Sequence, residues 1–177
     1  QHAKIIHIDI DPAEIDKNIS SYLSVIGDVK NTLQKLFTKL KPQKHPEWIA
    51  EVEGYRAREL ENYPSGNTLH PKTMIEKVSE YTDNRTIIAT DVGQHQMWTA
   101  QFYKFKAPRT FLTSGGLGTM GYGMGAAIGG CIGSKQRTVL FTGDGSFGMN
   151  LNELATAVQN ELPLIIFIMN NGVLGMV

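Results

Sequence analysis

The sequence predicts an α/β protein built around parallel β-strands, and three features of the 177-residue chain indicate this class. Short apolar runs, such as residues 139–141 and 164–169, alternate with stretches whose apolar residues recur at helical spacing. Glycines or polar residues follow these runs, where parallel strands would end. Most of the 18 glycines fall between Gly115 and Gly145, which favours close approach of the backbone to another group. Ligands of such sheets bind at the carboxyl ends of the strands, so the candidate site is expected there.

Composition limits the functions open to the protein. Seventeen basic and seventeen acidic residues leave no net charge, which argues against general binding to nucleic acid or to an anionic membrane. Cys131 is the only cysteine, so no disulfide can form within the chain; it could pack in a core or react as a thiol. No signal peptide is evident, and no apolar run is long enough to cross a bilayer. Residues 1–4 lead directly into a strand and the chain stops at Val177, so we expect an internal portion of a longer polypeptide.

Residues 1–42 are predicted to end a nucleotide-binding-like domain. Residues 5–10 (IIHIDI) and 23–26 form two short strands, and aspartates lie at their carboxyl ends. Asp11 precedes a proline and Asp28 precedes a helical pattern, so each is expected to cap a helix. Carboxylates at strand ends also bind ribose hydroxyls, and both roles stay open. The helix after Asp28 has one apolar face, made of Leu33, Leu36, Phe37 and Leu40.

Residues 43–68 are predicted to be a linker with a connecting helix, and residues 69–177 a second domain. The segment 39–45 (KLKPQKH) is basic and contains a proline, which marks the boundary. A helix over 46–63 follows, and a turn at 64–67 ends it. One side of this helix carries Trp48, Ile49, Val52 and Tyr55.

Two strands of the second domain end in strings suited to phosphate contact. A strand over 86–90 runs into DVGQHQMW, which contains Gln94 and His95. A strand over 111–113 runs into the glycine-rich segment 114–123, and the helix after it is rich in Gly, Ala and Ile. Glycines at a strand end followed by a helix suit an anion, because free N–H groups point at it. His95 alone could equally be a helix-start or surface residue.

The central unit of the second domain is residues 143–171. A strand ends at Gly143, one helical pattern follows, and a strand over 164–169 ends in a pair of asparagines. Such a unit is a crossover between parallel strands, so Asp144 and Asn171 are expected to converge at one edge of the sheet. The face predicted for its helix is Leu151, Leu154, Ala155 and Val158.

Asp144 and Asn171 offer oxygen ligands. Carboxylate and amide oxygens are what Mg²⁺ or Ca²⁺ requires, and Mg²⁺ fills its remaining positions with phosphate oxygens and water. Taken singly, GDG could be only a tight turn and NN only a polar strand end.

Joined by a strand–helix–strand unit, GDG and NN resemble the diphosphate-binding signature of thiamine-diphosphate-dependent enzymes. The strings GQHQMW and SGGLGTMGYG are similar to those of the catalytic large subunit of acetohydroxyacid synthase, also called acetolactate synthase. The resemblance implies that residues 69–177 are the thiamine diphosphate- and Mg²⁺-binding (PP) domain, truncated at its C-terminus. It implies Mg²⁺ ligands at Asp144, Asn171 and the carbonyl of Val173.

The same resemblance assigns roles around the cofactor. Gln94 and His95 would contact the diphosphate. Met120 would wedge between the two rings of thiamine diphosphate and impose a V shape, with the backbones of Gly118 and Met120 near the aminopyrimidine; otherwise Met120 would be a core filler. Met124 begins a departure from the family, since Met-Gly stands where Leu-Pro is usual. The other cofactor-binding positions implied are Gly143, Gly145, Ser146, Gly175 and Met176.

Residues 9–28 resemble the FAD segment in the central domain of acetohydroxyacid synthase. By that resemblance the FAD site would be lined by Asp9, Ile10, Asp28 and Val29. Asp16 stands where the family usually has Gly.

The reaction implied is decarboxylation of pyruvate on thiamine diphosphate and transfer of the hydroxyethyl unit to pyruvate or 2-oxobutyrate. This is the first common step of branched-chain amino-acid synthesis. The family uses a glutamate from a neighbouring subunit, in a domain expected before residue 1, so this portion alone is expected to be inactive. A homodimer or higher homo-oligomer, a possible small regulatory subunit, and a cytoplasmic or plastid-stroma location are implied too.

Three alternatives stay open. The first is another thiamine-diphosphate enzyme, such as an FAD-free acetolactate synthase, glyoxylate carboligase or a 2-oxoacid decarboxylase. The second is a dinucleotide-binding oxidoreductase domain, which the lack of a G-x-G-x-x-G motif after the first strand disfavours. The third is a non-catalytic regulatory or scaffold fragment, which would bind neither Mg²⁺ nor thiamine diphosphate.

Overall fold

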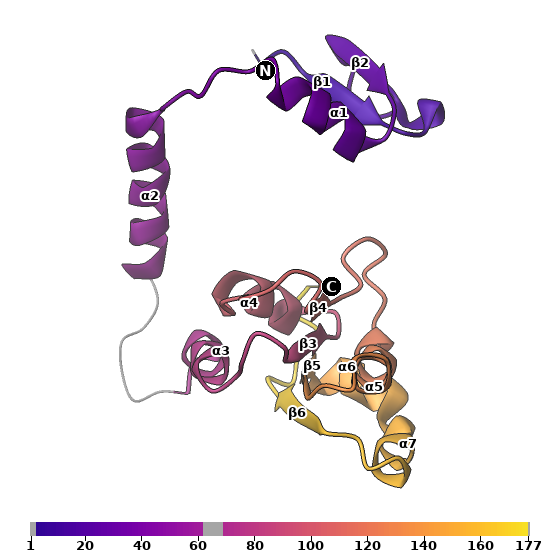
Figure 1. Ribbon diagram of the computed structural model, residues 1–177. Helices are drawn as coiled ribbons and strands as arrows, with labels where there is room; N and C mark the ends of the chain where they lie inside the picture. Colours follow the sequence, from indigo (N-terminus) through magenta and orange to yellow (C-terminus); the bar gives the residue numbers. More distant parts are fainter. Residues whose placement is uncertain (1–2, 62–68, 177) are drawn as a thin grey trace. The chain divides into compact units, whose positions relative to one another are not determined.

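A computed structural model of the chain describes residues 3–61 and 69–176 and divides into two compact units, residues 1–63 and 64–177 (Figure 1). The predicted turn at 64–67 and the end of the predicted linker lie outside the described residues. In the part of the chain that is described, no helix has both the length and the apolar character needed to cross a bilayer.

The first unit begins with two parallel strands, β1 (Ile6–Asp9) and β2 (Leu23–Ile26), paired from Ile6↔Leu23 to Asp9↔Ile26. A short 3₁₀ helix, η1 (Pro12–Glu14), and helix α1 (Val29–Phe37) follow β1 and β2 respectively. Helix α2 (Pro46–Glu61) completes the unit. The predicted strands and helices are confirmed, although Leu40 lies beyond the end of α1.

Both helix caps predicted in this unit are present. The Asp11 carboxylate accepts a hydrogen bond from Ala13 N at 2.9 Å, and that of Asp28 accepts one from Asn31 N at 2.9 Å. Asp16, which replaces the usual glycine, adopts a left-handed conformation with φ 59°. Its side chain accepts hydrogen bonds from the N–H and the hydroxyl of Ser21, both at 2.7 Å. Aspartate tolerates this conformation because its short side chain bonds locally.

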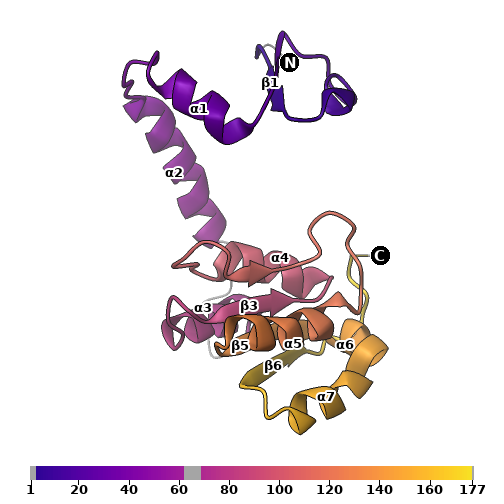
Figure 2. The ribbon, with the colours of Figure 1, turned by 45° about the vertical axis from the view of Figure 1, so that its right-hand side comes forward.

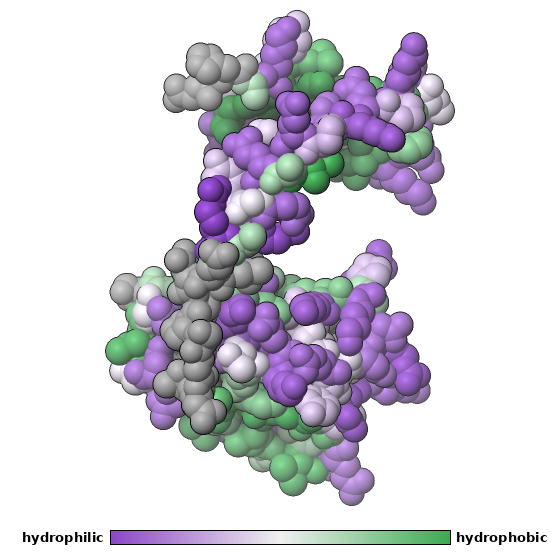
Figure 3. All heavy atoms as spheres, turned by 90° about the vertical axis from the view of Figure 1, so that its left-hand side faces the viewer, coloured by the Kyte–Doolittle hydropathy of each residue, from purple (hydrophilic) through white to green (hydrophobic). Residues whose placement is uncertain are grey.

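Apolar side chains stay exposed on the first unit, and hydrophobic residues are visible at the molecular surface in Figure 3. The helix over 46–63 is expected to be exposed, and the apolar residues of α2 are exposed, as is the predicted apolar face of α1. These residues are Leu33, Leu36, Phe37, Trp48, Ile49, Val52 and Tyr55.

The second unit is a four-stranded, fully parallel sheet in the order β4-β3-β5-β6. Its strands are β3 (Ile87–Thr90), β4 (Phe111–Leu112), β5 (Thr138–Gly143) and β6 (Leu164–Met169). The helices of this unit are visible in Figure 2. They comprise α3 (Pro71–Glu80), which precedes the sheet, and α4 (Gln94–Phe102), α5 (Tyr122–Ser134), α6 (Asp144–Asn150) and α7 (Leu154–Gln159) between its strands. The predicted α/β class with a parallel sheet is confirmed.

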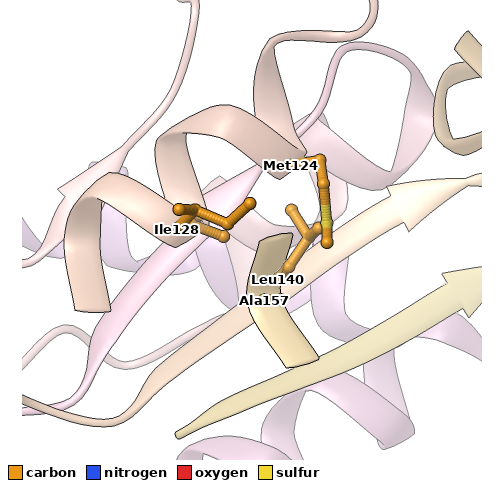
Figure 4. Packing of buried hydrophobic residues seen from close by; sticks show 6 residues of the cluster. Met124, Ile128, Leu140 and Ala157 are labelled. Carbon is orange, nitrogen blue, oxygen red and sulfur yellow. The ribbon is translucent and has the colours of Figure 1, made fainter. Parts of the chain in front are cut away.

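The core of this unit lies between the sheet and α5. Met124 and Ile128 on α5 pack with Leu140 of β5, and Ala157 of α7 closes the cluster (Figure 4). Glycine brings α5 close to the sheet: a Cβ at Gly130 would lie 3.2 Å from side-chain atoms of β3, β4 and β5. The small residues predicted to allow close packing therefore do so, and Cys131 is a buried packing residue.

The prediction of a single helix after Asp144 is wrong in detail. The segment comprises α6, a 3₁₀ turn η2 (Leu151–Glu153) and α7 instead of one helix. Leu154 packs against the core as predicted, but Leu151, Ala155 and Val158 are exposed and Ala157 is buried instead. The 3₁₀ turn has fewer residues per turn than an α-helix, so it shifts the phase of the buried face.

Candidate functional site

A cavity of about 300 Å³ opens at the carboxyl ends of β3, β5 and β6. The site candidates of the second unit all line it, although they come from four separate stretches of the chain. They are Gln94, His95, Gly118, Met120, Gly143, Asp144, Gly145, Ser146, Asn171, Val173, Gly175 and Met176. The four candidates for FAD belong to the other unit.

Asp144 and Asn171 converge as the crossover predicts. Asp144 is the first residue of α6, and the pairing Gly143↔Met169 brings the ends of β5 and β6 level. Asn171 Nδ2 donates to Gln94 Oε1 at 3.0 Å, while its Oδ1 accepts from Val173 N at 3.2 Å. A carboxylate, an amide and the loop after β6 thus line the same cavity.

Gln94 and His95 begin α4, whose N-cap, Gly93, supplies no capping side chain. The imidazole of His95 lies between two glycines: a Cβ would be 2.8 Å from its Cε1 at Gly93 and 3.0 Å from its Nδ1 at Gly143. The residue is 5% exposed, and its Nε2 has no hydrogen-bond partner among the described residues. A buried polar atom in this state is expected to serve a ligand.

Burial lowers the pKa of His95 below its ordinary value of 6.5, because a charged ring would lose its hydration. The carboxylates of Asp91 and Asp144 act in the opposite direction and only partly offset this. A hydrogen bond from the ring to the backbone of Asp91 also raises the pKa of His95 without cancelling the effect of burial.

Met120 lies at the end of the loop between β4 and α5. Gly118 in this loop has φ 63°, a left-handed conformation that glycine adopts without strain. Across the cavity, a Cβ at Gly145 would lie 2.7 Å from Leu174 Cδ2 and 3.9 Å from Met120 Cε. A Cβ at Gly175 would collide with the side chain of Gln94. The absence of side chains at these two glycines allows the walls to come together.

Ser146 is buried, and its hydroxyl donates to the carbonyl of Val92 at 2.8 Å. This bond ties α6 to the loop after β3. The hydroxyl proton is thus committed within the protein.

Sequence reasoning missed several residues of the cavity wall. Trp98 could have been found, since it lies four positions after Gln94 on the same face of one helix. No spacing in the sequence indicates the other lining residues, Val92, Met169 and Leu174, because their contact with the cavity depends on the paths of the loops. Asp91 and Asn150, which support the wall from behind, were also missed.

The lining of the cavity carries little charge. Asp144 is the only carboxylate among the lining residues that the structure describes, and no lysine or arginine is among them. No group of three or more His, Cys, Asp or Glu side chains that could hold a metal occurs in the described ranges. An anionic ligand would therefore sit beside a carboxylate, which requires a bridging cation.

In the first unit, Asp9 and Asp28 lie at adjacent strand ends. Gly27 N donates to the carbonyl of Asp9 at 2.8 Å, and the Asp9 carboxylate accepts from Asp11 N at 2.9 Å. Ile10 and Val29 are both exposed beside them. The four residues predicted for FAD thus occupy neighbouring positions at one edge of the β1–β2 pair.

The fold and this cavity are those of a defined class of protein. Residues 91–177 match the C-terminal TPP binding domain of thiamine pyrophosphate enzymes, and residues 1–36 match the central domain of the same enzymes. The chain therefore belongs to the thiamine pyrophosphate enzyme family.

Similar proteins within this family include acetolactate synthases. The chain is 44% identical over 183 residues to acetolactate synthase 1, chloroplastic, of Nicotiana tabacum. It is also 44% identical over 178 residues to the isozyme 1 large subunit of Escherichia coli (strain K12), and 44% over 184 residues to the chloroplastic enzyme of Arabidopsis thaliana. These alignments use 99% of this chain but only 27%, 32% and 27% of those relatives. They confirm the resemblance to acetohydroxyacid synthase that the sequence motifs indicated.

Proposed function

We propose that the protein containing this chain is an acetolactate synthase. It would decarboxylate pyruvate on thiamine diphosphate and transfer the hydroxyethyl unit to pyruvate or 2-oxobutyrate. The observation that carries this proposal is the convergence of Gln94, His95, Met120, Asp144 and Asn171 on one cavity. The names of the relatives support this reaction over that of another thiamine-diphosphate carboligase or decarboxylase.

The residues of the cavity fit a diphosphate. The Nε2 atom of His95 is buried and has no hydrogen-bond partner among the described residues, and α4 begins at the cavity without a side-chain cap. Free N–H groups at a helix start favour an anion. These donors and the apolar wall near Met120 and Leu174 are suited to the two ends of thiamine diphosphate: charged at one end, aromatic at the other.

Mg²⁺ would be held by the carboxylate of Asp144, the amide oxygen of Asn171 and the carbonyl of Val173. Few protein oxygens suffice, because phosphate oxygens and water complete the coordination of Mg²⁺. The cation also removes the repulsion between Asp144 and the diphosphate. Asn171 Oδ1 already accepts a hydrogen bond from Val173 N, and its second lone pair would bind the cation.

Thiamine diphosphate supplies the ylide and electron sink when bound, and the chain supplies its position. Met120 would hold the bend between the two rings, while Asp144, Asn171 and His95 anchor the other end. Holding reacting groups in near-attack geometry contributes roughly 7–11 kcal/mol in favourable cases.

The intact enzyme would need more than these 177 residues. The chain spans 27–32% of the length of the relatives compared above. A catalytic glutamate in another domain, contributed by a neighbouring subunit, is part of the proposal. A homodimer or larger homo-oligomer and a small regulatory subunit belong to the same proposal. The cytoplasm or the plastid stroma is its location. Residues 1–177 alone would not form acetolactate.

FAD is proposed to bind at Asp9, Ile10, Asp28 and Val29. The test is Asp28→Ser, because serine caps a helix as well as aspartate does but removes the carboxylate. We expect flavin absorbance of the purified intact protein to fall, with α1 preserved. Asp11→Ser, which changes the cap of η1 in the same way, should keep its flavin. Equal flavin in both variants would remove Asp28 from the site.

The deciding test of the proposed function is Asp144→Asn. Calorimetric titration of the intact protein with thiamine diphosphate and Mg²⁺ should show affinity reduced by about tenfold or more, or roughly 1.4 kcal/mol. Glu153→Gln changes a carboxylate on η2 outside the cavity and should bind normally. Unchanged affinity in Asp144→Asn would remove the metal site from this position and refute the proposal.

A further inference from the structure

We propose that Asp91 is a positioning residue for the cofactor: its buried carboxylate holds the chain beside Met120, so that this side chain projects into the cavity. The proposal rests on the proposed function and assigns a role to a residue outside the set of expected ligands. Asp91 follows β3 directly, is 1% exposed, and does not line the cavity.

The Asp91 carboxylate accepts three backbone hydrogen bonds. Its Oδ1 accepts from Val92 N at 2.9 Å and from Gly121 N at 2.8 Å, and its Oδ2 accepts from Gly123 N at 2.9 Å. Two of these donors lie at the start of α5, where the N-cap residue, Gly121, has no side chain of its own. A carboxylate from another strand end therefore performs the capping.

Gly121 is held on both sides of its backbone. Its N–H is bound by Asp91, and its carbonyl accepts a hydrogen bond from Asn150 Nδ2 at the end of α6. Its φ is 85°, which an L side chain rarely adopts. The absence of a side chain at Gly123 leaves room for Asp91, since a Cβ there would lie 2.8 Å from both Asp91 N and Asp91 Oδ2.

Asp91 and Asn150 thus hold the backbone of Gly121, and we call these three residues the Asp91–Gly121–Asn150 clamp. Met120 immediately precedes Gly121 in the chain. The loop before it is exposed from Gly115 to Thr119, and within it Ser114 accepts hydrogen bonds from Gly118 N and Thr119 N. The buried anchor nearest to Met120 is therefore the Asp91–Gly121–Asn150 clamp. We infer that the clamp fixes the backbone position of Met120 and therefore the direction in which its side chain projects.

The experiment separates positioning from general support of the fold. Mg²⁺–pyrophosphate probes only the diphosphate anchor at Asp144 and Asn171, whereas Mg²⁺–thiamine diphosphate also needs the wall at Met120. Both affinities are measured by calorimetry on the intact wild-type protein, Asp91→Asn, Met120→Ala and the double variant. Asparagine has the size of aspartate, but its NH₂ group would face one of the three backbone N–H donors and could not accept its hydrogen bond.

We expect Asp91→Asn to lose about tenfold in thiamine diphosphate affinity and less than about twofold in pyrophosphate affinity. The double variant should bind no worse than Met120→Ala, because Asp91 acts through Met120. Asp83→Asn is the matched control, since Asp83 also accepts three hydrogen bonds, at the start of β3 and outside the cavity. It should leave both affinities unchanged.

Three results would overturn the role of Asp91: equal loss of both ligands, loss of neither, or additive losses in the double variant. If Asp91→Asn does not fold, Asn150→Ala tests the other arm of the clamp and should show the same selective loss. A proportional change in both ligands there would also refute the role. Wild-type protein that binds neither ligand would refute the proposed function instead, so the two failures are distinguishable.

Discussion

The burial of His95 makes the stability of the protein depend on pH, because a buried ring is harder to protonate. The folded-state pKa of His95 is lowered by burial, so the unfolded chain binds a proton more readily than the folded protein. As pH falls below the ordinary histidine pKa of 6.5, stability is lost until the folded-state pKa is reached.

We predict that His95→Gln reduces the loss of stability of the cofactor-free protein below this pH. Urea unfolding between about pH 5 and pH 7.5 measures the effect, since histidine titrates in this range. His45→Gln, at an exposed position before α2, should keep the wild-type profile. A profile unaltered by His95→Gln would show that the ring is not buried as described.

Among the residues of the site, the types and the spacing of Asp144 and Asn171 were readable from the sequence, because parallel strands end at one edge. The bond from Asn171 to Gln94 was not, since it joins residues whose side chains meet only in the folded sheet. The role of Ser146 likewise depends on a carbonyl of another loop.

Helix α5 shows that glycines in one helix have different functions. A Cβ at Gly123 would collide with Asp91, whereas one at Gly129 would meet nothing within 4 Å. Only the former glycine is required by packing. The sequence predicts a closely packed helix here but does not distinguish the two positions.

We predict that Gly123→Ala destabilises the protein by about 1–3 kcal/mol, as expected for overpacking. Gly129→Ala in the same helix should be neutral or stabilising by up to about 1 kcal/mol, because alanine has the higher helix propensity. Thermal unfolding of both variants checks this. If the two variants unfold at the same temperature, α5 does not pack on Asp91.

The whole second unit depends on the core between α5 and the sheet, where Leu140 is 0% exposed. We predict that Leu140→Ala costs about 2–5 kcal/mol of unfolding free energy, from lost burial and the cavity left behind. Val158→Ala, at a residue that is 76% exposed, should change it by less than about 0.5 kcal/mol.

Denaturation followed by Trp98 fluorescence in a Trp48→Phe background restricts this measurement to the second unit, because the two tryptophans lie in different units. A midpoint shared by Leu140→Ala and Val158→Ala would contradict the assigned core.

The sequence by itself determined the α/β class, the strands and their order along the chain, the caps at Asp11 and Asp28, and the pair Asp144 and Asn171. These follow from local periodicity and from residue types at strand ends, which are properties of neighbouring residues. The tertiary structure alone decided the break between α6 and α7, the burial of His95, and the clamp of Asp91 on Gly121 and Gly123. Each of these depends on contacts between residues far apart in the chain, whose geometry is set only when the sheet and its helices pack.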